Sequence, residues 1–81
     1  MAGYMVSADN EKVILLTQEG RVKFRIAPEN FQEVGVEHLA SHAGLVDIGF
    51  AVTYEERNGR RYIRGAQEIP PPFPYPQDEG S

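Results

Sequence analysis

Hydrophobic and polar residues alternate over much of the stretch from residue 12 to residue 69, with the period of two that is typical of β-strands. Residues 13–17 form an aliphatic run, and residues 21–27 alternate cleanly after a turn sequence that contains Gly20. Because glycine readily adopts the positive φ that tight turns require, the two segments predict a β-hairpin.

A second hairpin is predicted in the C-terminal half of the chain. Val46, Ile48, Phe50, Val52 and Tyr54 share one parity and are expected to face the core. The segment continues through Arg57-Asn58-Gly59, and Asn-Gly is a strong signal for a two-residue turn. Residues 62–69 are expected to return as the partner strand.

The connection between the two hairpins fits two structures. Phe31, Val34, His38 and Leu39 share a helical face, and Gly44 could follow a helix C-terminus. Residues 33–38, around Gly35, also fit a short strand, so helix and strand both stay open for residues 31–43. The whole pattern predicts an all-β fold, a small five-stranded antiparallel barrel with one short helical or 3-10 connector.

The chain is expected to divide into three parts. Residues 1–11 carry little pattern and are expected to form an N-terminal segment, and residues 12–69 form the barrel. Residues 70–81 are rich in proline and end in acidic residues, which predicts a flexible tail, extended as polyproline II or disordered.

Charge and composition narrow the possible settings. The 81 residues carry a formal net charge of −4 and include no cysteine, which favours a reducing, cytoplasmic location. The longest apolar run, residues 13–16, is far too short to span a membrane, and no signal peptide is expected.

Basic residues concentrate on two predicted strands of this acidic chain. One outward row holds Arg21, Lys23 and Arg25, and a second holds Arg60, Tyr62 and Arg64. Such rows favour an anionic partner, although each is most often simply the solvated face of a strand. The second row also has possible cross-strand partners in Glu55, Glu56 or Asp47. Whether the two rows share one surface is left open by the sequence.

The order of elements resembles a cold-shock domain, a small OB-fold barrel that binds single-stranded RNA and DNA. The similar elements are Glu19-Gly20-Arg21 leading to Phe24-Arg25-Ile26-Ala27-Pro28, then residues 36–41, then Ile48-Gly49-Phe50-Ala51-Val52 followed by Asn58-Gly59. The resemblance covers residues 12–69 and implies single-stranded nucleic-acid binding.

The chain departs from this family in the aromatic residues on which bases stack. Lys23 and Arg25 stand at positions that the family fills with aromatic residues, and His38 is what remains of the second aromatic strand. Stacking contributes about 1–3 kcal/mol per base, so binding is expected to be weaker and more electrostatic, with Arg25 stacking in place of an aromatic ring.

Other chemistry is expected to be absent. His38 and His42 have the four-residue spacing of helical metal ligands, but pH-sensitive surface histidines are the expected role, with no metal and no cofactor. No catalytic pair or phosphate loop is recognisable, so no enzyme is expected.

A rival function is a protein-interaction or inhibitor module, in which Phe73 and Tyr75 on the stiff tail bind a protein partner.

Overall fold

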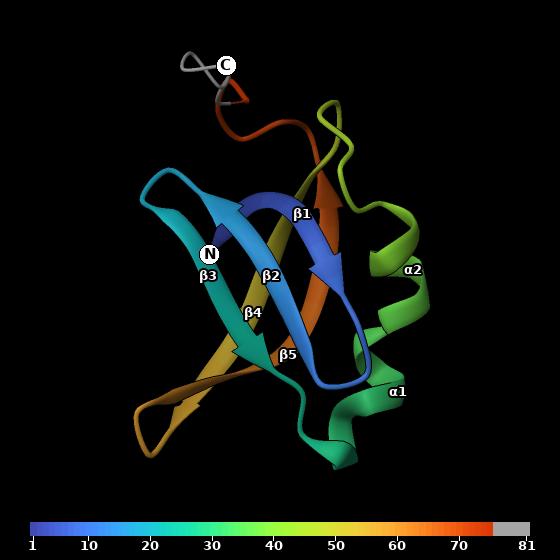
Figure 1. The fold of residues 1–81 in the computed structure, drawn as a ribbon, viewed down its shortest axis with the longest axis vertical. Helices are drawn as coiled ribbons and strands as arrows, with labels where there is room; N and C mark the ends of the chain where they lie inside the picture. The colour runs from blue at the N-terminus through green and yellow to red at the C-terminus, as the bar shows by residue number, and fades with distance from the viewer. Residues whose placement is uncertain (76–81) are drawn as a thin grey trace.

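The structure, a computed structural model, describes residues 1–75 and forms a closed barrel of five strands (Figure 1). The strands are β1 (Ala2–Ala8), β2 (Lys12–Thr17), β3 (Gly20–Arg25), β4 (Gly49–Arg57) and β5 (Arg60–Ile69). Around the barrel they follow the order β1–β2–β3–β5–β4, and β4 pairs with β1 to close it. The prediction of a small, mainly β, five-stranded barrel with a short helical connector is confirmed.

One pairing in the barrel differs from the predicted antiparallel arrangement. The β1–β2, β2–β3, β4–β5 and β1–β4 pairs are antiparallel, whereas β3 and β5 run parallel and meet at Arg25 and Tyr62. The reason is geometric, because an odd number of strands cannot alternate in direction all the way around a closed ring.

The first strand lies inside the segment expected to precede the barrel. β1 begins at Ala2 rather than at residue 12, and Gly3, Tyr4 and Met5 are buried in succession. An irregularity in the β1–β2 register between Met5 and Ser7 further disturbs the alternation. Three consecutive buried residues hide the period of two, which explains why the pattern of this segment did not predict a strand.

The connector between β3 and β4 is helical, which decides between the two structures that the sequence left open. It consists of η1 (Pro28–Asn30), α1 (Phe31–Val34) and α2 (Val36–Ser41). Gly35 separates the two α-helices in the left-handed conformation, with φ 71°. Residues 36–41, which resemble a cold-shock strand in sequence, are therefore α2. None of the helices within residues 1–75 is long and apolar enough to cross a membrane.

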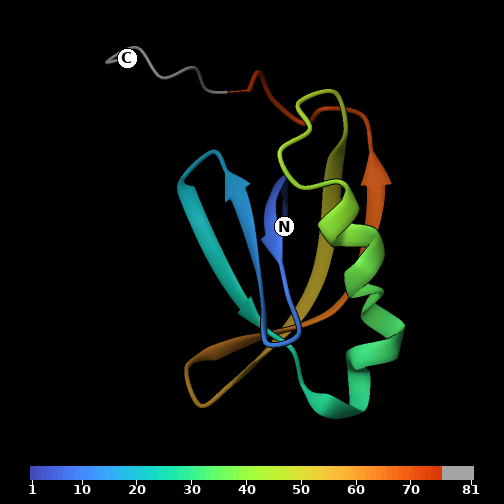
Figure 2. The same cartoon turned by 45° about the vertical axis from the view of Figure 1, so that its right-hand side comes forward.

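The helices lie against one side of the barrel (Figure 2). α2 packs on β1 and α1 packs on β5, and Val34, Val36 and Leu39 are buried in the same cluster as the strand residues. Gly44, after α2, donates its backbone N–H to the carbonyl of Met5 at 2.9 Å. The helical connector thus contributes side chains to the core from the side of β1 and β5.

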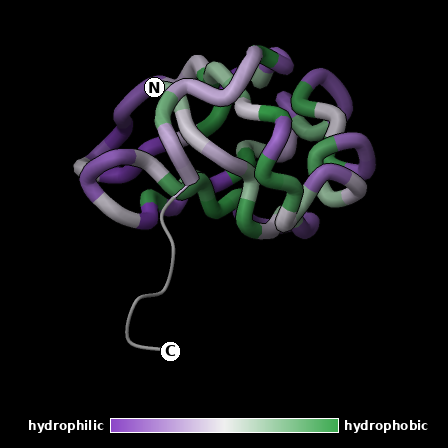
Figure 3. Tube along the Cα trace, turned by 90° about the horizontal axis from the view of Figure 1, so that it is seen from above, coloured by the Kyte–Doolittle hydropathy of each residue, from purple (hydrophilic) through white to green (hydrophobic). Residues whose placement is uncertain are grey.

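The core contains the side chains that the alternation predicts. Seen from above, many of the hydrophilic stretches lie in the outer loops, and hydrophobic stretches lie among the central segments (Figure 3). Phe24, Phe50, Val52 and Ile63 are each at most 2% exposed. The prediction of a core position for Val46 is wrong: β4 begins only at Gly49, so Val46 lies in the preceding loop and is 53% exposed.

Candidate nucleic-acid interface

The parallel contact between β3 and β5 brings the two basic segments of the sequence onto one surface. Figure 1 shows the β4–β5 hairpin extending beyond the barrel on the side of β3. Between them lies an open hollow of about 250 Å³, which we name the basic hollow; it is lined by Lys23, Arg25, Gly59, Arg60 and Arg61. The question that the sequence left open is therefore answered by the strand order.

The turn at the tip of the hairpin forms as the sequence predicts. Asn58 and Gly59 both have positive φ, 53° and 78°, and join strands that pair directly at Arg57 and Arg60. This two-residue turn requires positive φ at both positions, which Asn and Gly tolerate best. It holds Arg60 and Arg61 beside β3.

The four cations of the basic hollow lack acidic partners in the part of the chain that the structure describes. Lys23, Arg60 and Arg61 are exposed and Arg25 is half-buried. The ion pairs among residues 1–75 involve Arg57, Arg64 and the two histidines, and none involves these four side chains. Their charges are thus available to an anion, and each repels the others until one binds.

The neighbouring strand adds an aliphatic border to this basic surface. In the β2–β3 register, Ile14 lies opposite Lys23 and Leu16 lies opposite Arg21. Both aliphatic side chains are half-buried and alternate with the buried Val13, Leu15 and Thr17. Arg21 is exposed in the same outward row of β3 but does not line the hollow. The surface therefore offers cations and aliphatic groups rather than aromatic rings.

Arg64, which the sequence places in the second basic row, is neutralised by a carboxylate. Its guanidinium donates to Glu55 at 2.7 Å, and Arg57 donates to the same oxygen at 2.9 Å. These hydrogen bonds, from Arg57 first and then from Arg64, hold the pKa of Glu55 below its ordinary value of 4.5. Arg64 thus follows the alternative that the sequence left open, a solvated strand face with paired charges.

Arg57 also covers Tyr62 and links the hairpin to the helical connector. Its guanidinium carbon lies 5.3 Å from the centre of the Tyr62 ring, within the range of a cation–π contact. Arg57 Nη1 lies 3.4 Å from a carboxylate oxygen of Glu29 in η1. The pKa of Arg57 is raised chiefly by its hydrogen bond to Glu55. Arg57 thus covers one face of the Tyr62 ring, and a base would have to displace the guanidinium to stack on that face.

The alternation of residues along β5 does not predict that Arg61 lines the basic hollow. Arg61 has the same parity as the buried Ile63, yet it lies beyond the end of the core and its guanidinium carbon is 5.8 Å from the centre of the Tyr54 ring. The doublet Arg60-Arg61 beside a turn is the signal that could have found it, because both neighbours are exposed where a hairpin extends past its barrel.

His38 is not part of the basic surface. It lies on α2 and its Nε2 is 2.8 Å from Glu68, near the end of β5. Glu68 is eight residues from Arg60 along this strand, which corresponds to about 26 Å at the usual rise per residue. The sequence-based site therefore divides, with His38 at one end of β5 and the basic hollow at the other.

The two aromatic residues of the tail pack against Tyr4 of β1. Phe73 and Tyr75 are half-buried, with ring centres 5.1 and 4.9 Å from that of Tyr4. The Tyr4 hydroxyl donates a hydrogen bond to the Phe73 carbonyl. The acidic end of the tail, with Asp78 and Glu79, lies outside the described residues.

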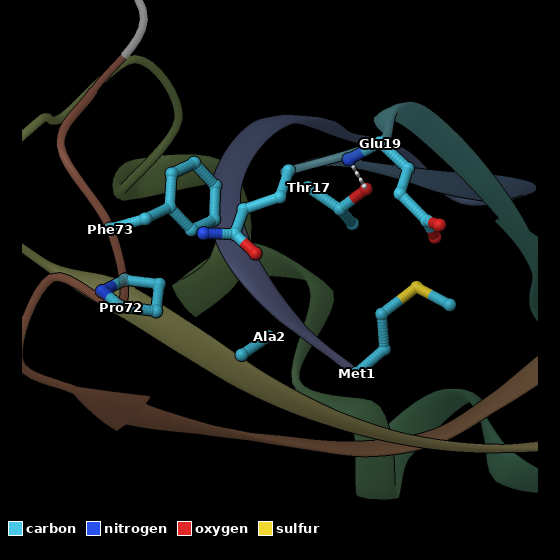
Figure 4. Close-up of a pocket in the computed structure, with 7 residues that line it drawn as sticks. Met1, Ala2, Thr17, Glu19, Pro72 and Phe73 are labelled. Atoms are coloured by element: carbon cyan, nitrogen blue, oxygen red, sulfur yellow. Dashed lines mark hydrogen bonds between the residues drawn. The ribbon is translucent and has the colours of Figure 1, made fainter.

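A second hollow, of about 420 Å³, lies where the tail passes the N-terminus (Figure 4). It is lined by Met1, Ala2, Thr17, Gln18, Glu19, Pro72 and Phe73. Thr17 accepts a hydrogen bond from the backbone of Glu19 at 3.2 Å, so its hydroxyl belongs to the β2–β3 turn. Glu19 is the one titratable side chain in this lining, and the N-terminal ammonium of Met1 donates a hydrogen bond to the carbonyl of Val52 at 2.9 Å.

No protein-family model, curated protein or solved structure matches this chain.

Proposed function

We propose that this chain binds single-stranded nucleic acid, RNA or DNA, without catalysing a reaction, and that the basic hollow is its contact site. One observation carries the proposal: the β3–β5 pairing gathers Lys23, Arg25, Arg60 and Arg61 into one hollow, with no carboxylate paired to them among residues 1–75. In a chain of net charge −4, such a concentration of unpaired cations favours a locally bound polyanion.

The connectivity of the barrel supports the same site. The strand order β1–β2–β3–β5–β4, with the helices between β3 and β4, resembles the OB fold. OB folds bind oligonucleotides on the face of strands 2 and 3 and on the loops between strands 1 and 2 and between strands 4 and 5. Lys23 and Arg25 lie on β3, and Gly59 lies in the β4–β5 turn.

The proposal does not extend to cold-shock recognition. The segment that resembles the second aromatic strand of that family is α2, and His38 lies far from the basic hollow. Ile14 and Leu16 provide an aliphatic surface beside the cations. Contact with this surface would contribute less binding free energy per base than stacking on an aromatic ring does. Phosphate contacts would then dominate the affinity, in a cytoplasmic setting that the lack of cysteine favours.

The rival function, a protein-interaction or inhibitor module acting through the tail, is less well supported. Phe73 and Tyr75 are the residues that would bind a partner, and both already pack against Tyr4. A protein partner would have to displace these contacts before it could use the two rings. No comparable contact covers the basic hollow within the described part of the chain.

The test is a titration of labelled single strands of about 12 nucleotides, one DNA and one RNA, which is long enough to cover one OB site. If all four cations contact phosphates, the logarithm of the association constant should fall with the logarithm of salt concentration at a slope of about −2.8, from ~0.7 per contact. The double variant Lys23→Gln/Arg25→Gln should reduce the magnitude of this slope by about 1.4.

A matched control separates the site from the overall charge. Gln32→Glu/Gln67→Glu brings the net charge from −4 to −6, as the first double variant does (−4 − 2), and both glutamines are exposed on α1 and β5. The control should keep most of the affinity and the full slope. Absence of binding at low salt, or an equal loss in both double variants, would refute the proposed site.

A further inference from the structure

Three side chains with metal-binding atoms meet on the side of the barrel that carries the helices. His38 lies on α2, His42 caps the C-terminus of this helix, and Glu68 lies on β5. His38 Nε2 is 2.8 Å from one oxygen of Glu68, and His42 Nε2 is 3.9 Å from the other. One ligand atom from each residue lies within 4.8 Å of the other two.

The helix creates the histidine pair. Residues four apart on a helix lie on one face, and the two imidazole centres are 4.4 Å apart. The buried Phe50 ring is nearly perpendicular to both imidazoles, at angles of 86° and 79°, with its centre 5.7 Å from that of His42 and 6.5 Å from that of His38. The pair is thus backed by the hydrophobic core on one side, and Glu68 stands across from it.

Hydrogen bonds around His42 orient its other nitrogen toward Glu68. His42 Nδ1 is 2.9 Å from the carbonyl oxygen of His38, which can only accept, so Nδ1 carries the proton. The hydroxyl of Ser41 donates to the same carbonyl at 2.7 Å, which leaves its oxygen as a second acceptor 3.1 Å from Nδ1. In the neutral ring, Nε2 therefore presents a lone pair. Histidine ligands of metals characteristically donate their second nitrogen to a carbonyl in this way.

The spacing of the remaining atoms suits a cation. At 3.9 Å, His42 Nε2 and the Glu68 oxygen are too far apart for a hydrogen bond. Ligand atoms around tetrahedral zinc lie about 3.4 Å apart, given bonds of about 2.0–2.2 Å. A small movement of side chains would therefore bring all three ligand atoms to a shared ion.

From this geometry we infer that His38, His42 and Glu68 bind a divalent transition metal of the zinc type. The ligand atoms are Nε2 of each histidine and a carboxylate oxygen of Glu68. Two imidazoles favour Zn²⁺ over Mg²⁺ or Ca²⁺, which prefer oxygen ligands. The His38 and Glu68 side chains are 55% and 44% exposed, so the fourth position of a tetrahedral ion is open to water or to a ligand from a partner.

Zinc would replace a hydrogen bond and connect two elements. The 2.8 Å contact between His38 Nε2 and Glu68 would open, the Nε2 proton of the neutral imidazole would move to Nδ1, and Nε2 and the carboxylate oxygen would both bind the ion. The ion would then join the end of α2 to β5. An ion that binds the folded chain in preference to the unfolded chain must raise the Tm.

The experiment is calorimetric titration of Zn²⁺ into the chain without any affinity tag, after treatment with a chelator. We expect one ion per chain and a Tm that rises with zinc concentration. His42→Gln and Glu68→Gln should each weaken zinc binding at least tenfold and abolish the rise in Tm. Glu33→Gln removes an exposed carboxylate from α1 and is the matched control, which should bind zinc as the unaltered chain does.

A second measurement needs no variant and therefore does not depend on variants folding. Zinc should shift the Nε2 resonances of both imidazoles in the NMR spectrum of the unaltered chain. Co²⁺ in place of Zn²⁺ should give the visible absorption of a tetrahedral site. The inference would be overturned if the unaltered chain failed to bind zinc. It would also be overturned if His42→Gln and Glu68→Gln bound zinc as tightly as the unaltered chain does.

Discussion

Arg25 of β3 and Tyr62 of β5 lie opposite each other in the parallel pairing of the barrel. The two residues are 37 positions apart in the chain (62 − 25), and each belongs to one of the two basic segments. Their pairing makes one surface from two strands that no local pattern connects. The surface has two halves, a hollow with unpaired cations beside Arg25 and a network of paired charges beside Tyr62.

The difference between these halves predicts unequal effects for two substitutions that each remove one positive charge. Lys23→Gln should weaken oligonucleotide binding and reduce the magnitude of the salt slope by about 0.7, because Lys23 is a free cation of the basic hollow. Arg64→Gln should change both little, because Arg64 is held by Glu55 at 2.7 Å. Titrations at several salt concentrations measure both quantities, and equal losses would contradict the division of the surface.

The paired half of the surface predicts a dependence of stability on acid. The pKa of Glu55 is held below 4.5 in the folded chain by Arg57 and Arg64. A carboxyl whose folded pKa is depressed contributes stability above its unfolded pKa and loses it as pH falls through the folded pKa. Glu55→Gln should therefore lower the Tm at pH 6, and the difference from the unaltered chain should shrink as the pH falls below 4.5 and vanish once Glu55 is protonated in the folded chain.

Thermal unfolding followed from pH 2 to pH 7 checks this expectation. Glu56→Gln is the matched control, because Glu56 is the exposed neighbour of Glu55 on β4 and has no ion pair within the described residues. Its Tm should remain close to that of the unaltered chain at every pH. If the Tm of Glu55→Gln equals that of Glu56→Gln at pH 6, the network contributes no stability.

Local patterns predicted the two hairpins because each depends on neighbours in the chain. The Asn58-Gly59 turn and the burial of alternate residues such as Phe50 and Val52 follow from backbone preference and a period of two. β1 was not predicted, since its buried residues are consecutive. The sequence also left α1 and α2 open, because Gly35 interrupts the helical pattern at the position where the backbone turns left-handed.

The candidate site was less predictable because it depends on closure of the barrel. Parity correctly places Lys23 and Arg25 on the outer side of β3, but it cannot tell which strand lies beside them. Arg61 lies in the hollow although its parity is that of Ile63, since the hairpin extends past the core. His38 joins Glu68 through contacts between residues 30 positions apart, which no local pattern contains.

The close approach of β1 to β2 predicts that replacing Gly3 by any residue with a Cβ lowers the stability of the fold. A Cβ at Gly3 would lie 2.1 Å from the carbonyl oxygen of Leu16, which is backbone and cannot rotate away. Gly3→Ala should therefore destabilise the chain by about 1–3 kcal/mol or more. Gly65→Ala is the matched control on β5, where the added Cβ would meet Thr53 at an ordinary 3.4 Å. Urea unfolding measures both, and equal midpoints would contradict the observed approach of the strands.

The packing of the tail on Tyr4 predicts that Phe73 stabilises the barrel. Phe73 is half-buried and its ring meets the buried Tyr4 ring edge-on at 5.1 Å. Phe73→Ala should cost about 1–2 kcal/mol in urea unfolding, less than a fully buried phenylalanine would cost. Pro74→Ala alters an exposed neighbour and should leave the unfolding midpoint unchanged.

The same variant tests whether the tail or the basic hollow contacts nucleic acid. Phe73 lies beside the β2–β3 turn, whereas the basic hollow lies beside the β4–β5 turn. If nucleic acid binds in the basic hollow, Phe73→Ala should leave oligonucleotide affinity unchanged at a temperature where the variant remains folded. If affinity fell with Phe73→Ala but not with Lys23→Gln, the tail rather than the hollow would be the contact site.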